Sequence, residues 1–284
     1  ARDQQSRVWL IKKDQIGRLP LARLTVADVE RWHTRLRAGG MADSGIKNQH
    51  GVQRAALSQA VRWGWVSSNV ASLARLRSTK VHQRGVMTVD EVRSVMRAAA
   101  SIDAAAELAL RIAAVAGACR AEIASLRWTD EHDGQLLIDS ATEITSRGDG
   151  FPVLREAPTT TANLRTVTLD AEAFQLIANL RGAREPYGPW MFGLGPDLVS
   201  PDRFGWWWGR ARQISGIDSK WRLHDLRHWS ATVAIGRGHD VRTVAGRLGH
   251  ANPAMTLRVY AHAFAAADQA VAAGLGEILK RDDK

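Results

Sequence analysis

One short region near the C-terminal end of the sequence carries the side chains that most constrain what this chain can fold into. It contains the run His224-Asp225-Leu226-Arg227-His228, then Leu248-Gly249-His250, and, ten residues further on, Tyr260. The region reads as helical throughout, so imidazole, guanidinium and phenol groups gather on a few neighbouring helices. Together these groups provide the nucleophile, the proton transfer and the positive charge that attack on a phosphodiester needs.

The order and spacing of these residues resemble the C-terminal active-site boxes of the tyrosine recombinase, or phage integrase, family. The resemblance implies that Tyr260 is the nucleophile, forming a 3′-phosphotyrosine link and freeing a 5′-hydroxyl. Because that covalent link preserves the bond energy for religation, neither a cofactor nor a metal is expected. Tyrosine is scarce, with Tyr187 the only other one. The alternative for Tyr260 is an aromatic packed in a helical core.

The remaining boxes imply roles for three further side chains. Arg227 matches the second active-site arginine, whose guanidinium gives two parallel hydrogen bonds to nonbridging phosphate oxygens. His224, three residues earlier on the same helix face, matches a proton acceptor or phosphate contact. His250 matches the third-box histidine that hydrogen-bonds the scissile phosphate. We expect a structural role for His228, which points away from Arg227.

The sequence departs from the family pattern at two cationic positions. The first box aligns from Gly117 through Glu122 to Asp130, which puts Cys119 where the first catalytic arginine belongs. We interpret Cys119 as a small buried hydrophobe. Arg120 is one residue away, about 100° around an α-helix, and would reach the phosphate only from a distorted helix start. In the hairpin run Pro158 to Val167, Thr159 takes the place of the family's lysine.

These departures leave two main hypotheses open. The first is site-specific DNA recombination or integration through the Tyr260 link. The second is a catalytically silent or impaired relative that binds DNA but lacks the cations replaced by Cys119 and Thr159. Arg147 or Arg155 is an alternative source of the hairpin cation, although neither is in register. A topoisomerase with the same nucleophile, or an unrelated basic DNA-binding protein, fits the ordered boxes less well.

The composition favours a polyanionic partner. Lys and Arg outnumber Asp and Glu by 39 to 29, giving a net charge of +10 and a pI near 10.5. Most of these cations are Arg, whose planar fork suits phosphate oxygens. A single cysteine excludes an internal disulfide framework and a cysteine metal cluster, and it fits a reducing cytoplasm.

The chain shows no membrane or export signal. It has no apolar run of about 18 residues, so we expect no transmembrane helix. Its first residues lack a signal-peptide pattern and do not form a natural start, so we expect a fragment or a processed chain. We therefore expect a cytoplasmic protein in a bacterial or phage-infected cell.

The length of 284 residues, 45% of them hydrophobic, is enough for two domains with real cores. We predict a mainly α protein: a small helical core-binding domain over residues 1–74, a polar, basic linker over 75–87 and an α+β catalytic domain over 88–284. The resemblance implies that the two domains clamp double-stranded DNA. It also implies a homotetramer on DNA, with a monomer or dimer when free.

The predicted N-terminal domain contains two amphipathic helices. Thr25 is the expected N-cap of a helix ending near Arg37 and Gly39. A longer helix is expected from Ser44 to Trp65, with an apolar stripe of Val52, Ala56, Ala60 and Trp63. The polar positions between them, which are candidates for DNA contact or for a solvated face, are Lys47, Gln49, His50, Gln53 and Arg54. Further DNA-binding candidates in the chain are Lys80, Arg120 and Arg165.

The predicted catalytic domain begins with a capping box, Thr88 to Glu91, followed by a buried helix from Asp103 to Ala116. Alternation and β-branched residues predict a three-stranded antiparallel sheet. Its expected strands are 135–140, 151–156 and 165–169, with a turn at 147–150. Helices then run from Ala171 to Leu279, broken by the loop 186–201. Trp206 to Trp208 are expected to pack, leaving one ring exposed, and 265–279 is expected to dock on its own domain or on a neighbouring protomer.

Overall fold

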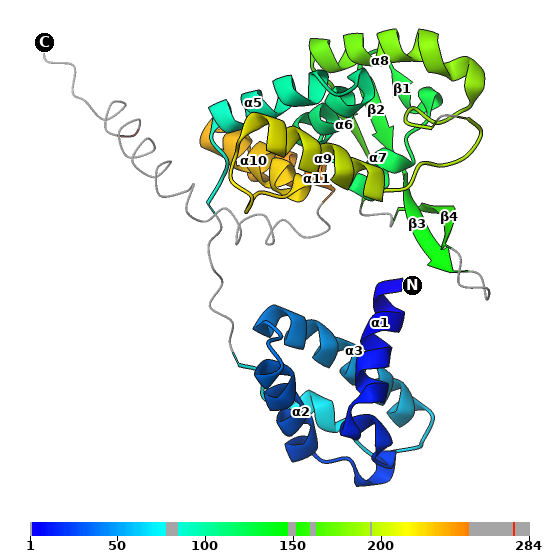
Figure 1. The fold of residues 1–284 in the computed structure, drawn as a ribbon, viewed down its shortest axis with the longest axis vertical. Helices are drawn as coiled ribbons and strands as arrows, with labels where there is room; N and C mark the ends of the chain where they lie inside the picture. The colour runs from blue at the N-terminus through cyan, green and yellow to red at the C-terminus, as the bar shows by residue number, and fades with distance from the viewer. Residues whose placement is uncertain are drawn as a thin grey trace, which may run out of the picture. The chain divides into compact units, whose positions relative to one another are not determined.

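The computed structural model describes residues 2–77, 85–146, 152–159, 163–193 and 195–249, together with Leu275. The chain divides into two compact units, one centred on residues 1–84 and one on 85–144 with 152–284 (Figure 1). Both are mainly helical, which confirms the predicted fold class. None of the helices in the described segments is both long and apolar enough to cross a membrane.

The first unit is built from helices joined by short turns. Its helices are α1 (Arg2–Lys13), α2 (Val26–Ala38), α3 (Asp43–Arg62) and α4 (Val70–Leu73). Thr25 and Asp28 form the capping box that starts α2, and Gly39 ends that helix, so the predicted helix boundaries are confirmed. Ile16, Val29 and Trp32 form the apolar centre of this unit.

The buried face of α3 differs from the predicted one. Ala56 and Trp63, two members of the predicted apolar stripe, are exposed. The buried positions are instead Ile46, Gln49, His50, Gln53, Leu57 and Ala60. They recur at helical spacing, so α3 has one buried face, but its apolar residues alone do not show which face that is. Polar side chains occupy half of this face, which is why hydrophobic periodicity pointed elsewhere.

Two histidines meet inside the first unit, one from each long helix. The His50 Nδ1 and His33 Nε2 atoms are 3.3 Å apart, with both side chains buried and the rings edge to face. Burial, the neighbouring His50 and the Arg37 charge lower the pKa of His33. Burial and Arg54 lower the pKa of His50. Both rings are therefore favoured in their neutral form in the folded unit.

This pair predicts that the first unit loses stability in mild acid. Because the folded pKa values lie below the ordinary value of 6.5, the unfolded chain binds more protons and stability falls as the pH drops below about 6.5. Each histidine contributes a slope of at most about 1.4 kcal/mol per pH unit. In His50→Gln we expect a shallower loss of urea stability between pH 7 and pH 5, followed by tryptophan fluorescence. His239→Gln, at an exposed position, is the control and should keep the parent slope; an unchanged slope in His50→Gln would contradict the prediction.

The second unit is a helical layer around a small sheet. Its helices are α5 (Val89–Ala100), α6 (Ala104–Val115), α7 (Arg120–Ala124), α8 (Ala171–Arg184), α9 (Asp202–Ser215), α10 (Leu223–Gly236) and α11 (Val241–Leu248). The Thr88 capping box and the buried, alanine-rich α6 are confirmed. Trp207 and Trp208 are buried whereas Trp206 is exposed, also as predicted. Met87, within the predicted linker, is buried in this core, while 78–84 lie outside the described residues.

The predicted three-stranded antiparallel sheet is confirmed with two of its predicted strands, near 135–140 and 165–169, whereas the predicted strand 151–156 belongs to another pair. Strands β1 (Glu131–His132), β2 (Gln135–Ile138) and β5 (Arg165–Thr168) form an antiparallel sheet in the order β1-β2-β5. Strands β3 (Ser140–Ser146) and β4 (Pro152–Pro158) form a separate pair that extends away from the helices in Figure 1. The third strand is β1, which is joined to β2 by a tight turn at Asp133 and Gly134, both with positive φ. The predicted turn at 147–150 lies outside the described residues.

Candidate active site

Arg227 joins three segments that are far apart in the sequence. It lies on α10, which starts after a capping box formed by Arg222 and Asp225. Its Nη1 donates to the carbonyl oxygen of Gly117 at 2.6 Å, and its Nη2 donates to that of Leu248. Gly117 precedes α7 and Leu248 ends α11, so the guanidinium of the second box holds the first and third boxes together.

Two glycines allow this close approach. Gly117 has a φ of +63°, and a Cβ atom there would lie 2.3 Å from Cδ2 of Leu248. Gly249 has a φ of +69°, and its Cβ atom would lie 2.8 Å from Nη1 of Arg165. Only glycine takes up this backbone conformation without strain and also leaves room for the neighbouring side chain. Both box glycines therefore have a packing role.

A buried ion pair fixes Glu122, a residue of the first box. Nη1 of Arg165 lies 2.8 Å from Oε1 of Glu122, Nη2 lies 3.0 Å from Oε2, and both side chains are less than a tenth exposed. Burial opposes the Glu122 charge, but the Arg165 hydrogen bonds and charge outweigh it and lower the pKa of Glu122. The prediction that Arg165 contacts DNA is therefore corrected: this guanidinium is committed to Glu122 inside the protein.

Cys119 is the N-cap of α7. Its backbone N–H donates to Oε2 of Glu122 at 2.7 Å, and the side chain that we interpreted as a small buried hydrophobe is half-buried. Burial and the nearby Glu122 carboxylate raise the pKa of the Cys119 thiol, which keeps it neutral. Arg120, the first residue of α7, is exposed and pairs at 3.2 Å with Asp202 on α9. The helix start is therefore regular, and the Arg120 guanidinium lies toward α9.

Thr159 follows directly after β4. Its amide and its hydroxyl both donate to the carbonyl oxygen of Asp139, at 2.7 and 3.0 Å. The two bonds fix Thr159 beside the loop between β2 and β3. A neutral side chain therefore occupies the position that aligns with the family's lysine.

His224 and His228 lie one turn apart on α10, with their rings edge to face and their centroids 5.0 Å apart. The His224 side chain retains solvent access. Partial desolvation, followed by the proximity of His228 and Arg227, lowers the pKa of His224. A neutral imidazole at neutral pH is the form that can accept a proton.

The other predicted residues divide by location. Lys47 and Arg54 are exposed on α3, as a DNA contact requires. His50 is buried against His33, so its proposed contact with DNA is corrected. Lys80, His250 and Tyr260 lie outside the described residues. In the described part of the chain, no group of three or more His, Cys, Asp or Glu side chains could hold a metal ion.

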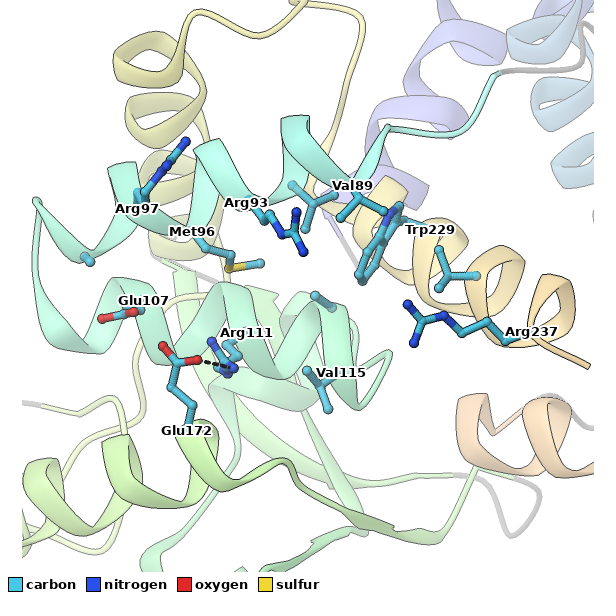
Figure 2. Close-up of a pocket in the computed structure, with 14 residues that line it drawn as sticks. Val89, Arg93, Met96, Arg97, Glu107, Arg111, Val115, Glu172, Trp229 and Arg237 are labelled. Atoms are coloured by element: carbon cyan, nitrogen blue, oxygen red, sulfur yellow. Dashed lines mark ion pairs between the residues drawn. The ribbon is translucent and has the colours of Figure 1, made fainter. Parts of the chain in front are cut away.

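A groove of about 610 Å³ lies elsewhere in the second unit, between α5, α6 and α10. In Figure 2 the Trp229 ring lies in it beside Val89, and Glu172 from α8 pairs with Arg111. Trp229 follows Arg227 by two residues, about 200° around α10. The groove and the candidate active site therefore use different faces of the same helix.

Arg247, on α11 near the candidate active site, was not among the residues predicted from the sequence. Its guanidinium donates to the carbonyl oxygens of Val115, at 2.9 and 3.1 Å, and of Thr168, at 2.8 Å. A basic residue in the last turn of a helix is normally read as an exposed complement to the helix dipole. The only hint in the sequence is its place directly before Leu248-Gly249.

Comparison with known proteins agrees with the family resemblance of the sequence motifs. The model of the phage integrase family matches residues 85–267. The putative prophage phiRv2 integrase of Mycobacterium tuberculosis is 24% identical over 280 residues, covering 93% of this chain and 69% of that protein. Among solved structures, the Tn1549 transposon integrase with transposon right end DNA has a TM-score of 0.78 at 18% identity, covering 94% and 91% of the two chains. A lambda integrase tetramer bound to a Holliday junction has a TM-score of 0.62 at 20% identity, covering 88% and 70%.

Proposed function

We propose that this chain, which belongs to the phage integrase family, carries out site-specific DNA recombination with Tyr260 as the nucleophile. The Tyr260 hydroxyl attacks the scissile phosphate, forming a phosphotyrosine bond and releasing the 5′-oxygen of the other DNA segment. The covalent bond stores the energy for rejoining, so the reaction conserves the number of phosphodiester bonds.

The observation that carries the proposal is the position of Arg227. Its guanidinium bridges the carbonyl oxygens of Gly117 and Leu248, so positive charge lies where all three boxes meet. A guanidinium fixed in this way can stabilise the negative charge that builds up on the phosphate. His224, on the same helix and favoured as neutral, would accept a proton in this reaction. His250 would contact the phosphate from the segment after Gly249.

We propose double-stranded DNA as the partner of both units. The net charge of +10 and the exposed Lys47 and Arg54 on α3 support this. The first unit would then be the core-binding domain and the second the catalytic domain, joined by the predicted linker. The similar solved structures are integrases bound to DNA, and the lambda integrase tetramer supports a tetramer on DNA for this chain as well.

The test is covalent capture of DNA. Duplexes that bind the protein are first selected from a random-sequence library, and a strand nick is then placed near the crossover point so that cleavage is irreversible. We expect a protein–DNA adduct that survives denaturation and is absent in Tyr260→Phe. Tyr187→Phe, which removes the other tyrosine, should leave adduct formation unchanged. An adduct that persists in Tyr260→Phe would overturn the proposed nucleophile.

A further inference from the structure

Arg247 makes a clamp between the third box and the rest of the second unit. We define the Arg247 clamp as the Arg247 guanidinium with the carbonyl oxygens of Val115 and Thr168. Val115 is the last residue of α6, where carbonyl groups lack partners within the helix. Thr168 is the last residue of β5. A single side chain on α11 therefore fastens this helix to the ends of two other elements.

The backbone of Arg247 is held as well. Its carbonyl oxygen accepts a hydrogen bond from Nε of Arg165 at 3.0 Å, while the other nitrogens of Arg165 bind Glu122. The last turn of α11 is thus fixed through both its side chain and its main chain. In the described residues no carboxylate pairs with the Arg247 guanidinium, and burial lowers its pKa. Among the described residues its hydrogen-bond acceptors are carbonyl groups, and the charge of Asp170 opposes the effect of burial.

The clamp lies close in sequence to both acceptors of Arg227. Val115 precedes Gly117 by two residues, and Arg247 directly precedes Leu248. The same guanidinium that binds Val115 therefore also sets where the Leu248 carbonyl lies relative to that of Gly117. These two carbonyls are the partners of Arg227. A shift of α11 would separate them and disturb the seat of the Arg227 guanidinium.

We propose that Arg247 is a positioning residue for DNA strand cleavage, acting through the alignment of Arg227 without contact with DNA. This inference rests on the proposed function. A misplacement of about 1 Å in such a site can lower the rate about 100-fold while leaving substrate binding intact. Arg247→Met should therefore slow adduct formation by about that factor. Arg247→Lys should lose less, because an ammonium group still donates to a carbonyl but lacks the planar fork.

The cleavage test uses the full chain and the nicked duplex described above, at saturating protein. The single-turnover rate of adduct formation and the Kd for the same duplex are measured separately. Arg242→Met, which removes an exposed positive charge from the same helix, is the matched control and should keep the parent rate. We expect Arg247→Met to change the rate and not the Kd; equal losses in Arg242→Met would overturn the proposal.

A double-mutant cycle separates positioning from general support of the fold. If Arg247 acts through Arg227, adding Arg247→Met to Arg227→Lys should lower the rate by no more than about twofold, because the two changes remove one function. Independent effects that multiply would show that Arg247 only stabilises the unit. The comparison uses temperatures at which all variants are fully folded.

Amide hydrogen exchange gives a readout that needs no activity. In the free protein, Arg247→Met should speed exchange in α11 and at Leu248 and Gly249, while the middle of α6 keeps its protection. If neither the parent chain nor a variant with both family cations restored forms an adduct, the proposed function fails and the clamp is judged by exchange alone. Unchanged exchange in α11 would then overturn the clamp itself.

Discussion

Replacement of Arg165 by methionine is expected to destabilise the second unit by about 3–5 kcal/mol, because the buried Glu122 carboxylate loses its partner. In a chain of this size that corresponds to a fall in melting temperature of roughly 10 °C, measured by calorimetry. The Glu122 side chain would keep the hydrogen bond from the Cys119 amide, with the Arg227 charge nearby. The result follows from the cost of an unpaired buried charge, so it holds whether or not the protein cleaves DNA.

The loss of stability in Arg165→Met should depend on pH in a defined direction. In the parent chain the pKa of Glu122 is lowered, so this carboxylate contributes stability above its ordinary value of 4.5 and loses it as the pH falls below that value. In Arg165→Met the unpaired, buried carboxyl has a raised pKa and is relieved by protonation. The difference between variant and parent should therefore be largest at neutral pH and shrink toward pH 4.

Two control variants test whether the loss in Arg165→Met comes from the unpaired buried charge. Arg120→Met removes an arginine from an exposed pair with Asp202 nearby, and it should cost at most about 1 kcal/mol. The double variant Arg165→Met with Glu122→Leu should recover most of the loss, because an apolar pair of similar volume replaces the ion pair. A loss in Arg165→Met no larger than in Arg120→Met would contradict the structural role assigned to the buried pair.

The fold was predictable wherever local chemistry fixes an element. The capping boxes at Thr25 and Thr88 mark helix starts because they satisfy backbone N–H groups within four residues. The sheet was harder, because an Asp133-Gly134 turn makes a strand of two residues, too short for an alternating pattern. The face of α3 was missed because His50 and two glutamines are buried on it, and such burial depends on partners from another helix.

The site was predictable in its residue types but not in its supports. The boxes placed Arg227 and His224 correctly on one helix, since spacing along a helix is a local property. That Arg165 pairs with Glu122 depends on the approach of β5 to the start of α7, a contact between residues far apart in the sequence. Arg247 was missed for the same reason, because its acceptors are main-chain carbonyls, which carry no sequence signal.

The second large effect is expected from restoring the two family cations. Cys119→Arg together with Thr159→Lys should raise the single-turnover rate of adduct formation by about 10⁴- to 10⁶-fold, since each preorganised donor of charge is worth about 10²–10³. Cys119 lies two residues after Gly117, whose carbonyl oxygen is 2.6 Å from Arg227. The backbone of residue 119 therefore lies near the Arg227 guanidinium, and we expect an arginine side chain there to neutralise the same phosphate.

Each position makes a separate contribution to this prediction. A lysine at 159 would remove the hydroxyl that donates to the Asp139 carbonyl. The backbone amide of residue 159 donates to the same carbonyl, so the backbone after β4 should keep its conformation. Lysine can also donate a proton to the departing 5′-oxygen, which threonine does poorly, so Thr159→Lys alone should speed cleavage most when proton transfer limits the rate. Thr129→Arg adds a charge at an exposed position outside the register and should leave the rate unchanged. A parent chain that already forms adduct as fast as the double variant would mean that other residues supply both charges, and that the alignment at Cys119 and Thr159 does not describe this active site.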